Sequence, residues 1–321
     1  MAIEIGPGWT IGGGWTISTP PPSVATAGWY AGGSASPSIY STVDRITFAT
    51  DTATASVRGP LTLARYGFAG SGTVNNGWFF GGQTSTLVST VDRITYATDT
   101  ATASARGPLS SARRYAATSS DSSTYSWVSG GIDVSLSPSY SSQVSRITYA
   151  TDTDAPSLRG PLSLARSGID ATGTTQYGWN MGGYAPGVTF VSIIDRITYS
   201  TDTATASVRG PLSSAKYKAA VVTDSSTYGW YAGGNNGGSV VNRVTYATDT
   251  DTASVRGPLA GARAEPAGTC DNTYGWIGAG VISGYESSVT RITYATDTAT
   301  STNRGNLSVA RTFPGASSGI Q

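Results

Sequence analysis

The sequence repeats one phrase, and the interval between its copies is the feature that most limits the fold. The phrase reads DRITYATDTATAS at residues 92–104, with close copies at 44–56, 195–207 and 290–302. Six copies align on an arginine followed by Ile-Thr or Val-Thr, at intervals of 47 to 53 residues: Arg45, Arg93, Arg146, Arg196, Arg243 and Arg291. A unit of about fifty residues with several short strand patterns is typical of a propeller blade.

Each unit contains four strand patterns. An aromatic strand that ends in Gly-Gly, as in GWYAGG at 229–234, precedes the Arg-Ile-Thr strand, and a Thr-Asp turn leads to a third. A fourth follows a basic residue at the end of the unit, as in RYGFAGSG at 65–72. The 41 Gly and 18 Tyr, with only 12% charged residues, favour strands and turns over helices. We predict an all-β fold, a six-bladed propeller with four strands per blade.

A second landmark predicts how the ring closes. The basic residue that ends each unit, here called the closing basic residue, always lies 20 positions after the Arg of Arg-Ile-Thr: Arg65, Arg113, Arg166, Lys216, Arg263 and Arg311. Only ten residues follow Arg311, enough for one strand, whereas the unit that contains Trp29 lacks this first strand. We therefore expect the C-terminal strand to complete the first blade, within a propeller domain at 24–321.

The order of these motifs resembles the kelch repeat over roughly residues 24–321. An aromatic strand, Gly-Gly, a variable loop, Val-Asp-Arg-Ile-Thr-Tyr, a turn, Pro-Leu and a closing Arg follow one another as in kelch units. Kelch units usually place a Trp after the Tyr strand, and that region here reads TASVRG. The resemblance implies a divergent, kelch-like six-bladed β-propeller.

Nearly all variation in unit length falls in the loops after Gly-Gly, at 34–42, 83–90, 132–143, 184–193, 235–240 and 281–288. Propeller topology should bring these loops to one face, and variable loops on a rigid scaffold are typical of a recognition surface. The predicted binding residues are Tyr40, Tyr140, Tyr184, Phe190, Asn235, Asn236 and Tyr285. Aromatic faces beside amides and hydroxyls suit sugars or a protein partner. The alternative is that these side chains only cap the blades.

The charges separate into a repeated and an unrepeated set. Eighteen of the 20 basic residues occupy three repeated positions per unit, and only Arg114 and Lys218 do not. Nine of the 19 acids are also repeated, which leaves a net charge of −8 on the unrepeated residues and predicts an acidic variable surface. With a net charge of +1 overall, the chain offers no global field for nucleic acid or an anionic membrane.

The repeated Arg and Asp admit a structural and a functional interpretation. Charge-assisted hydrogen bonds between strands or blades would give them a scaffold role, which constant spacing favours. The alternatives are a ring of anion-binding arginines and a weak cation site at the aspartate of each Thr-Asp-Thr turn, which has too few oxygen ligands for a convincing calcium loop. The six turn aspartates are Asp51, Asp99, Asp152, Asp202, Asp249 and Asp297.

Catalytic chemistry finds little support in the sequence. The chain has no His, which removes the commonest general base and metal ligand, and the single Cys270 has no His partner for nucleophilic catalysis. A carboxylate pair for glycoside hydrolysis stays open, but no spacing points to one. We expect a protein that is not an enzyme and that has no catalytic residues, metal or cofactor.

Residues 1–23 lie outside the repeat and form a Gly-, Trp- and Pro-rich segment. The strip IGPGWTIGGGWTIS contains Gly-Trp-Thr-Ile twice and is followed by TPPP, a stiff spacer. It lacks the basic start and continuous apolar core of a signal peptide or membrane span. We expect an extended docking segment with anchors at Ile5, Trp9, Ile11, Trp15 and Ile17. Packing back on the propeller is the alternative.

This strip resembles short N-terminal segments, of the type I-G-P-G-I-T-I-G-G-G, on structural proteins of tailed bacteriophages. The resemblance implies a noncatalytic virion component of the tail, fibre or capsid surface, assembled in the host cytoplasm in multiple copies. Its partners would be other virion proteins through residues 1–23 and a host glycan or protein through the loops, with no nucleic acid and no membrane insertion. The alternative function is a soluble or secreted kelch propeller that binds carbohydrate or protein, a lectin or an adaptor.

Overall fold

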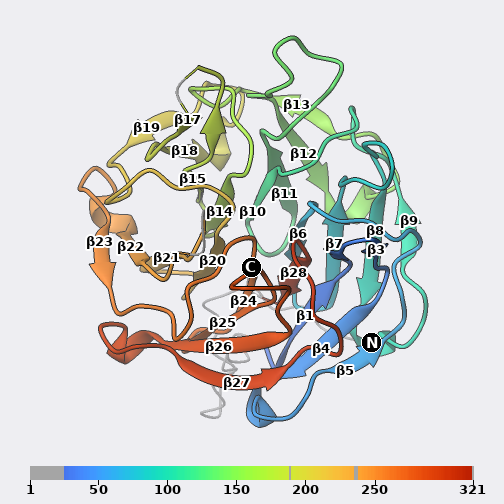
Figure 1. Cartoon of the computed structure of the whole chain (residues 1–321). Helices are drawn as coiled ribbons and strands as arrows, with labels where there is room; N and C mark the ends of the chain where they lie inside the picture. Colours follow the sequence, from blue (N-terminus) through green and yellow to red (C-terminus); the bar gives the residue numbers. More distant parts are fainter. Residues whose placement is uncertain (1–24, 188, 235–237, 320–321) are drawn as a thin grey trace, which may run out of the picture.

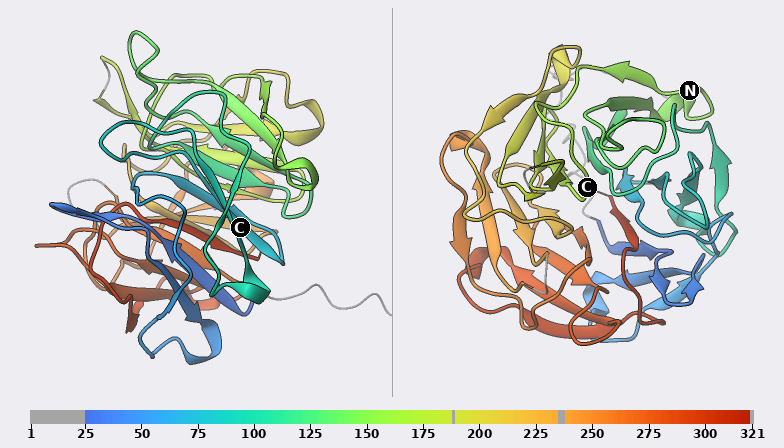
Figure 2. Two further views of the ribbon diagram at one scale, coloured as in Figure 1. Left: turned by 90° about the vertical axis from the view of Figure 1, so that its right-hand side faces the viewer. Right: turned by 45° about the horizontal axis from the view of Figure 1, so that its top comes forward.

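The described part of the computed structural model comprises residues 25–187, 189–234 and 238–319, and it is an all-β propeller. Six four-stranded antiparallel sheets surround a central axis, as the views in Figures 1 and 2 show. The fold predicted from the repeat is confirmed, including the number of blades and of strands per blade. The helices in the described residues are single 3-10 turns, and none is long and apolar enough to cross a membrane.

The strands of each blade are given from the axis outward. Blade 1 contains β28 (Gly315–Ser318), β1 (Ala27–Ala31), β4 (Val43–Thr47) and β5 (Ser56–Arg58). Blade 2 contains β6 (Ala69–Gly72), β7 (Asn76–Phe80), β8 (Val91–Thr95) and β9 (Ser104–Arg106). Blade 3 contains β10 (Ala117–Ser120), β11 (Tyr125–Ser129), β12 (Val144–Thr148) and β13 (Ser157–Arg159).

The other three blades follow the same order. Blade 4 contains β14 (Asp170–Gly173), β15 (Tyr177–Met181), β18 (Ile194–Thr198) and β19 (Ser207–Arg209). Blade 5 contains β20 (Ala220–Thr223), β21 (Tyr228–Ala232), β22 (Val241–Thr245) and β23 (Ser254–Arg256). Blade 6 contains β24 (Ala267–Cys270), β25 (Tyr274–Gly278), β26 (Ser288–Thr293) and β27 (Thr302–Asn306).

The C-terminal strand closes the ring, as predicted. Strand β28 pairs antiparallel with β1 from Gly28↔Ser318 to Ala31↔Gly315, so the first blade contains both ends of the described chain. Figure 1 shows this red strand beside the blue strands of blade 1. The short segment after Arg311 therefore becomes the innermost strand of a blade whose other strands begin almost 290 residues earlier.

The Trp of each second strand fastens its blade to the next one. Its ring stacks on the aromatic residue that follows Arg-Ile-Thr or Arg-Val-Thr in the next blade; Trp127 and Tyr199, for example, have centroids 3.7 Å apart. Its indole Nε1 donates a hydrogen bond of 2.8 or 2.9 Å to the turn aspartate of that blade. The six Trp–Asp pairs are Trp29–Asp99, Trp78–Asp152, Trp127–Asp202, Trp179–Asp249, Trp230–Asp297 and Trp276–Asp51.

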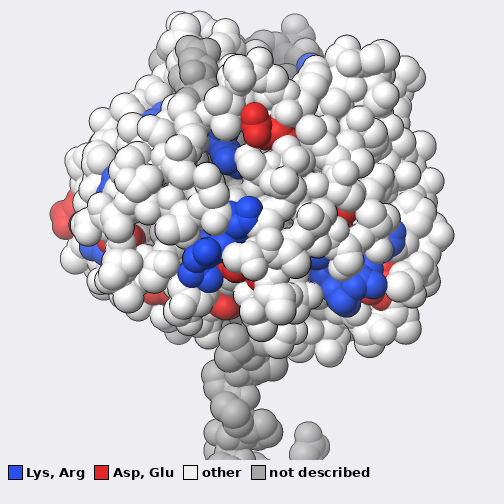
Figure 3. Space-filling view, turned by 60° about the horizontal axis from the view of Figure 1, so that its bottom comes forward, with Lys and Arg blue, Asp and Glu red and all other residues white. Residues whose placement is uncertain are grey.

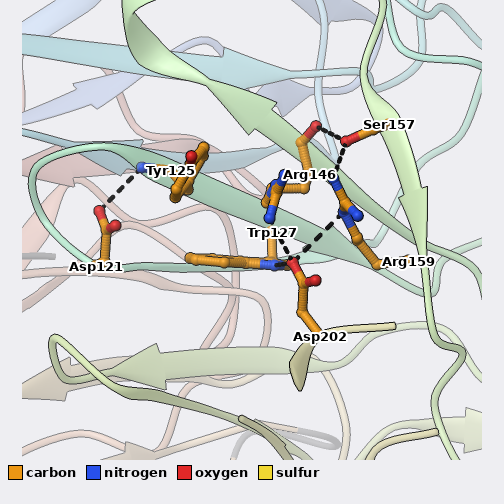
Figure 4. Close-up of polar contacts among 7 residues, drawn as sticks. All are labelled: Asp121, Tyr125, Trp127, Arg146, Ser157, Arg159 and Asp202. Atoms are coloured by element: carbon orange, nitrogen blue, oxygen red, sulfur yellow. Dashed lines mark hydrogen bonds and ion pairs between the residues drawn. The ribbon is translucent and has the colours of Figure 1, made fainter. Parts of the chain in front are cut away.

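The same turn aspartate accepts contacts from two arginines of the preceding blade. We call this set of contacts between two neighbouring blades a seam. Figure 4 shows one seam, in which the carboxylate of Asp202 lies between Trp127, Arg146 and Arg159. Its Oδ2 is 3.1 Å from Nη1 of Arg146 and 3.5 Å from Nε of Arg159. Equivalent contacts occur at all six seams. The repeated charges thus have the predicted scaffold role.

The closing basic residues are buried inside the blades, but only half of them have a carboxylate partner on the strand. Arg65, Arg166 and Arg311 pair with Asp92, Asp195 and Asp44 at 2.6 to 2.9 Å, and both partners are fully buried. Blades 3, 5 and 6 have Ser145, Asn242 and Thr290 at the position of this aspartate. These blades therefore bury a cation beside neutral strand residues.

Candidate functional site

The variable loops emerge at the end of each blade where the innermost strand begins. In blade 2 the first residue of β6, Ala69, pairs with Phe80, the last residue of β7, and Gly81 and Gly82 then lead into the loop. Both glycines have positive φ, 67° and 109°, a conformation that glycine adopts without strain. The register is equivalent in the other blades. We call the side that carries these loops the loop face.

The loops are tied to the residues that enter the central channel. Within the described residues, isolated bridges join the residue after the closing basic residue to a loop in five blades: Ser34↔Thr312, Tyr66↔Gln83, Arg114↔Ile132, Ser167↔Tyr184 and Ala264↔Val281. Two loops also form short hairpins, β2–β3 (Ser34–Ala35 and Ser38–Ile39) and β16–β17 (Tyr184–Ala185 and Thr189–Phe190). Loop residues and channel residues consequently share one surface.

Three of the predicted binding residues meet in one group on the loop face. The rings of Tyr140 and Tyr184 have centroids 5.6 Å apart, and Tyr184 lies 5.9 Å from Phe190. Phe190 stacks on Tyr217, with centroids 4.6 Å apart and planes inclined by 10°. All four side chains are half-buried. These four residues, from the loops of blades 3 and 4 and the entry to blade 5, are called the aromatic cluster.

The other predicted binding residues are not part of this cluster. Among the described residues, no ring contact joins Tyr40 or Tyr285 to it; Tyr285 is 42% exposed, and Tyr40 is half-buried. Asn235 and Asn236 lie outside the described residues. The predicted docking anchors Ile5, Trp9, Ile11, Trp15 and Ile17 also lie outside them, so the prediction for residues 1–23 stays a prediction.

A ring of six backbone hydrogen bonds surrounds the mouth of the channel on the loop face. In each blade the residue two positions after the closing basic residue donates its N–H to the carbonyl of the equivalent residue in the preceding blade, at 2.7 to 3.1 Å. All six residues have φ between 52° and 67°. They are Gly67, Tyr115, Gly168, Lys218, Glu265 and Phe313. The four that are not glycine adopt a conformation that costs an L-residue about 1 to 2 kcal/mol.

The side chains of these four residues gather over the channel mouth. The Nζ atom of Lys218 lies 3.2 Å from Oε1 of Glu265, and 4.6 and 4.5 Å from the ring centroids of Tyr115 and Phe313. It also lies 5.2 Å from the ring of Tyr217, which connects this group to the aromatic cluster. We call Tyr115, Lys218, Glu265 and Phe313 the mouth group.

Tyr217 and the mouth group were not predicted as site residues from the sequence. Lys218 was one of only two basic residues outside the repeated positions, and this was a usable signal. Tyr217 lies one position and Phe313 two positions after a closing basic residue, in a segment whose constant spacing suggested a scaffold role. Comparing the six residues at each of these positions would have shown that they differ in type from blade to blade.

The unrepeated acids are spread over both faces. Asp121, Asp224 and Asp271 accept backbone N–H bonds within the hairpin turns that precede the second strands, at the end of the blade opposite to the loops. Of the unrepeated acids, only Asp133 and Glu286 belong to the variable loops. The loop face is thus less acidic than predicted. Figure 3 shows another side of the molecule, where charged atoms form small separate groups on a mostly uncharged surface.

Two features of known catalytic sites, a group of metal ligands and an activated cysteine, are absent from the described residues. No group of three or more Cys, Asp or Glu side chains in this part of the chain could hold a metal ion. Burial raises the pKa of the Cys270 thiol to about 12, which keeps it in the weakly nucleophilic thiol form. The chemistry displayed by the loop face is therefore aromatic contact, hydrogen bonding and one ion pair.

Comparison with known proteins does not assign this chain to a family. No known protein-family model matches the sequence, and no curated protein matches it.

Proposed function

We propose that this protein is a noncatalytic recognition propeller whose loop face binds a carbohydrate or a protein on a host surface. The observation that carries the proposal is the aromatic cluster, in which half-buried rings from blades 3, 4 and 5 converge on the face with the variable loops. Half-buried aromatic side chains offer large apolar contact area at low entropic cost, and tyrosine adds a hydroxyl. The repeated charged residues, by contrast, are engaged in contacts between blades or buried inside them.

We further propose that the propeller is mounted on the virion of a tailed bacteriophage through residues 1–23. Support comes from the resemblance of IGPGWTIGGGWTIS to N-terminal segments of phage structural proteins. The blades would be divergent kelch repeats, supported by the order of Gly-Gly, Arg-Ile-Thr-Tyr and the closing basic residue. In such an assembly the N-terminal segment docks and the loop face is displayed.

A soluble or secreted lectin or adaptor is the second candidate. The observation that favours it is that every member of the aromatic cluster belongs to the propeller, so binding at the loop face requires no contribution from residues 1–23. In this case recognition would be the whole function, and the N-terminal segment would have no docking role.

Recognition is tested with the full chain on a glycan array and on candidate host cells. We expect Tyr184→Ala and Tyr217→Ala each to weaken binding at least tenfold, because each removes a central ring of the cluster. Val255→Ala is the control, since this exposed residue lies on the outermost strand β23, away from the variable loops. Equal binding by all three variants and the unaltered protein would contradict the proposed site.

Mounting is tested by deleting residues 1–23 and measuring incorporation into particles. The virion proposal expects the truncated protein to lose particle association while it still binds the glycan or cell ligand of the full chain. Incorporation at full occupancy without this segment would contradict docking through it. Absence of the full chain from any particle would favour the soluble lectin or adaptor.

A further inference from the structure

The wall of the central channel contains one charged residue at a level where the other blades have Ala or Gly. The position four residues after each closing basic residue is the first residue of the innermost strand. From blade 1 to blade 6 it is Gly315, Ala69, Ala117, Asp170, Ala220 and Ala267. A carboxyl at this place departs from a pattern that five blades keep, although the fold itself needs only a small side chain.

Asp170 faces a cavity and has no cationic partner. Its Oδ2 accepts a hydrogen bond from the backbone N–H of Ala219 at 3.1 Å, and no ion pair to it is found within the described residues. It borders a cavity of about 60 Å³ beneath the mouth, together with Phe68 and Tyr115. A second cavity of about 80 Å³ continues along the channel between the innermost strands. The carboxyl therefore lies where a small molecule could approach it.

The mouth directly above this cavity already accommodates an ammonium group. The Nζ atom of Lys218 is bounded by the rings of Tyr115 and Phe313 and by the carboxylate of Glu265. Aromatic faces and carboxylates together attract ammonium ions through the ring quadrupole and through charge. Glu265 is fully engaged, because its second oxygen accepts a bond from Thr312 Oγ1 at 2.8 Å. Asp170 is thus the carboxylate in this region that lacks a cation.

We propose that the cavity beneath the mouth binds a small primary ammonium group, whose charge is compensated by the carboxylate of Asp170. The ligand is either a free small amine or the ammonium tip of a lysine side chain on a partner. The aromatic and aliphatic wall, with Phe68, Ala116 and Pro266, would enclose the carbon that bears the nitrogen. No member of the aromatic cluster lines this cavity, and the proposal does not depend on the proposed recognition function.

Burial in the channel makes ligand binding compete with protonation of the carboxyl. It raises the pKa of Asp170 to about 8, so the carboxyl is largely protonated at neutral pH without a ligand. The Lys218–Glu265 pair lines the same cavity as Asp170. Asp170 also acts electrostatically on the buried hydroxyl of Tyr231, which in turn senses the guanidinium of Arg166. The Arg166 charge is already compensated by Asp195 at 2.8 Å.

The experiment titrates the full chain with methylammonium chloride by calorimetry at constant ionic strength. We expect saturable binding that weakens about tenfold between pH 7 and pH 6, because the ammonium binds the ionised carboxyl. Asp170→Ala, which introduces the residue of four other blades, and Asp170→Asn should each lose binding at least tenfold. Thr118→Ala, another channel position, is the control that should bind normally.

Four outcomes would overturn the proposal. The first is that methylammonium fails to bind the unaltered protein, and the second is that it binds Asp170→Ala and Asp170→Asn as tightly as the unaltered protein. Binding that does not depend on pH, or sodium ions that bind as tightly as methylammonium, would overturn it equally. A comparison of methylammonium with Nα-acetyl-lysinamide distinguishes the two sources of the ligand. Tighter binding of methylammonium supports a free amine, and tighter binding of the lysine derivative supports a partner's side chain. Thermal unfolding of each variant verifies that the propeller is intact.

Discussion

The seams between blades and the mouth of the channel are built on the same sixfold frame, yet they differ in how strictly the residues repeat. Every seam has a Trp, a turn aspartate and two arginines in equivalent contacts. At the mouth only the backbone hydrogen bonds and the backbone conformation repeat. The six residues there are two glycines, one lysine, one glutamate and two aromatic residues. The contrast separates residues that the fold requires from residues that it merely tolerates.

Removing the carboxylate of a seam should produce the largest loss in the free energy of unfolding. Asp202→Ala leaves Nε1 of Trp127 and the guanidinium groups of Arg146 and Arg159 without their shared acceptor. We expect a loss of about 3 kcal/mol in the free energy of unfolding, as for other nearly buried ion pairs that lose one partner. Urea unfolding of the full chain measures it.

The control is Asp154→Ala, two residues after a turn aspartate. Asp154 is exposed, and the equivalent residue is already Ala in four other blades, for example Ala204. Its replacement should change the free energy by less than about 0.5 kcal/mol. If both variants lost the same stability, the distinction between seam and surface carboxylates would fail.

The seams also explain what the sequence could and could not predict. Spacing was sufficient for the blade count and the closure, because a constant interval to the closing residue leaves only one arrangement for the C-terminal strand. The partners of Asp202 were not predictable in the same way. Every unit offers a Trp and two Arg of the same type, so only the distance between blades decides that Trp127, 75 residues earlier, is the donor.

The candidate site was predicted only in part, for a related reason. Tyr140, Tyr184 and Phe190 stood out because they lie in loops of unequal length. Their convergence depends on loop conformations that no repeated interval specifies. Tyr217 was missed because it follows Lys216 in a segment of constant length, and constant length does not imply constant side chains.

The second largest effect on stability should come from Asp170, the half-buried carboxyl in the channel wall that departs from the repeat. The pKa of Asp170 is about 8 in the folded protein and about 4 in an unfolded chain. Between these values the unfolded state binds fewer protons, so stability falls as pH rises from about 4 to about 8. Linkage at the full shift would give about 5 kcal/mol. Because the side chain of Asp170 is only half-buried, solvent screening reduces the decline, and we expect Asp170→Ala to remove roughly 2 kcal/mol of it over this window.

Urea unfolding of the unaltered protein and the variant, across pH 4 to 8, gives the difference curve. Thr118→Ala serves as the uncharged channel control and should give a flat difference. A flat curve for Asp170→Ala as well would show that the carboxyl ionises as easily as in water.

A smaller change in stability is expected when the buried ion pair is introduced into a blade that lacks it. Lys216 of blade 5 has Asn242 at the position of the partner aspartate, and burial lowers the pKa of its amine to about 8. Asn242→Asp should stabilise the protein by about 1 kcal/mol at pH 7, because it supplies the missing carboxylate. Urea unfolding tests this gain.

The pH dependence of the free energy of unfolding gives an independent test of the Asn242→Asp variant. In the unaltered protein the lowered pKa of Lys216 means that the unfolded state binds more protons between pH 8 and 10.5, so this group adds stability as pH rises there. The Asn242→Asp substitution raises that pKa, so the variant's advantage over the unaltered protein should shrink as pH rises through this window. An advantage that grew with pH would contradict the assignment.

The smallest change in stability is expected at the mouth, and it is the most informative about function. Lys218→Gly introduces the residue of Gly67 and Gly168, which occupy the same position in blades 2 and 4. It removes the ion pair with Glu265 and the ring contacts, worth about 1 to 2 kcal/mol together. It also relieves a left-handed conformation that costs a similar amount. The free energy of unfolding should therefore change by less than about 1 kcal/mol. A near-neutral result means that stability does not account for a lysine at this place, which leaves the chemistry of the mouth as its reason. A loss above about 2 kcal/mol would instead make the mouth group a structural seal, equivalent in kind to the seams.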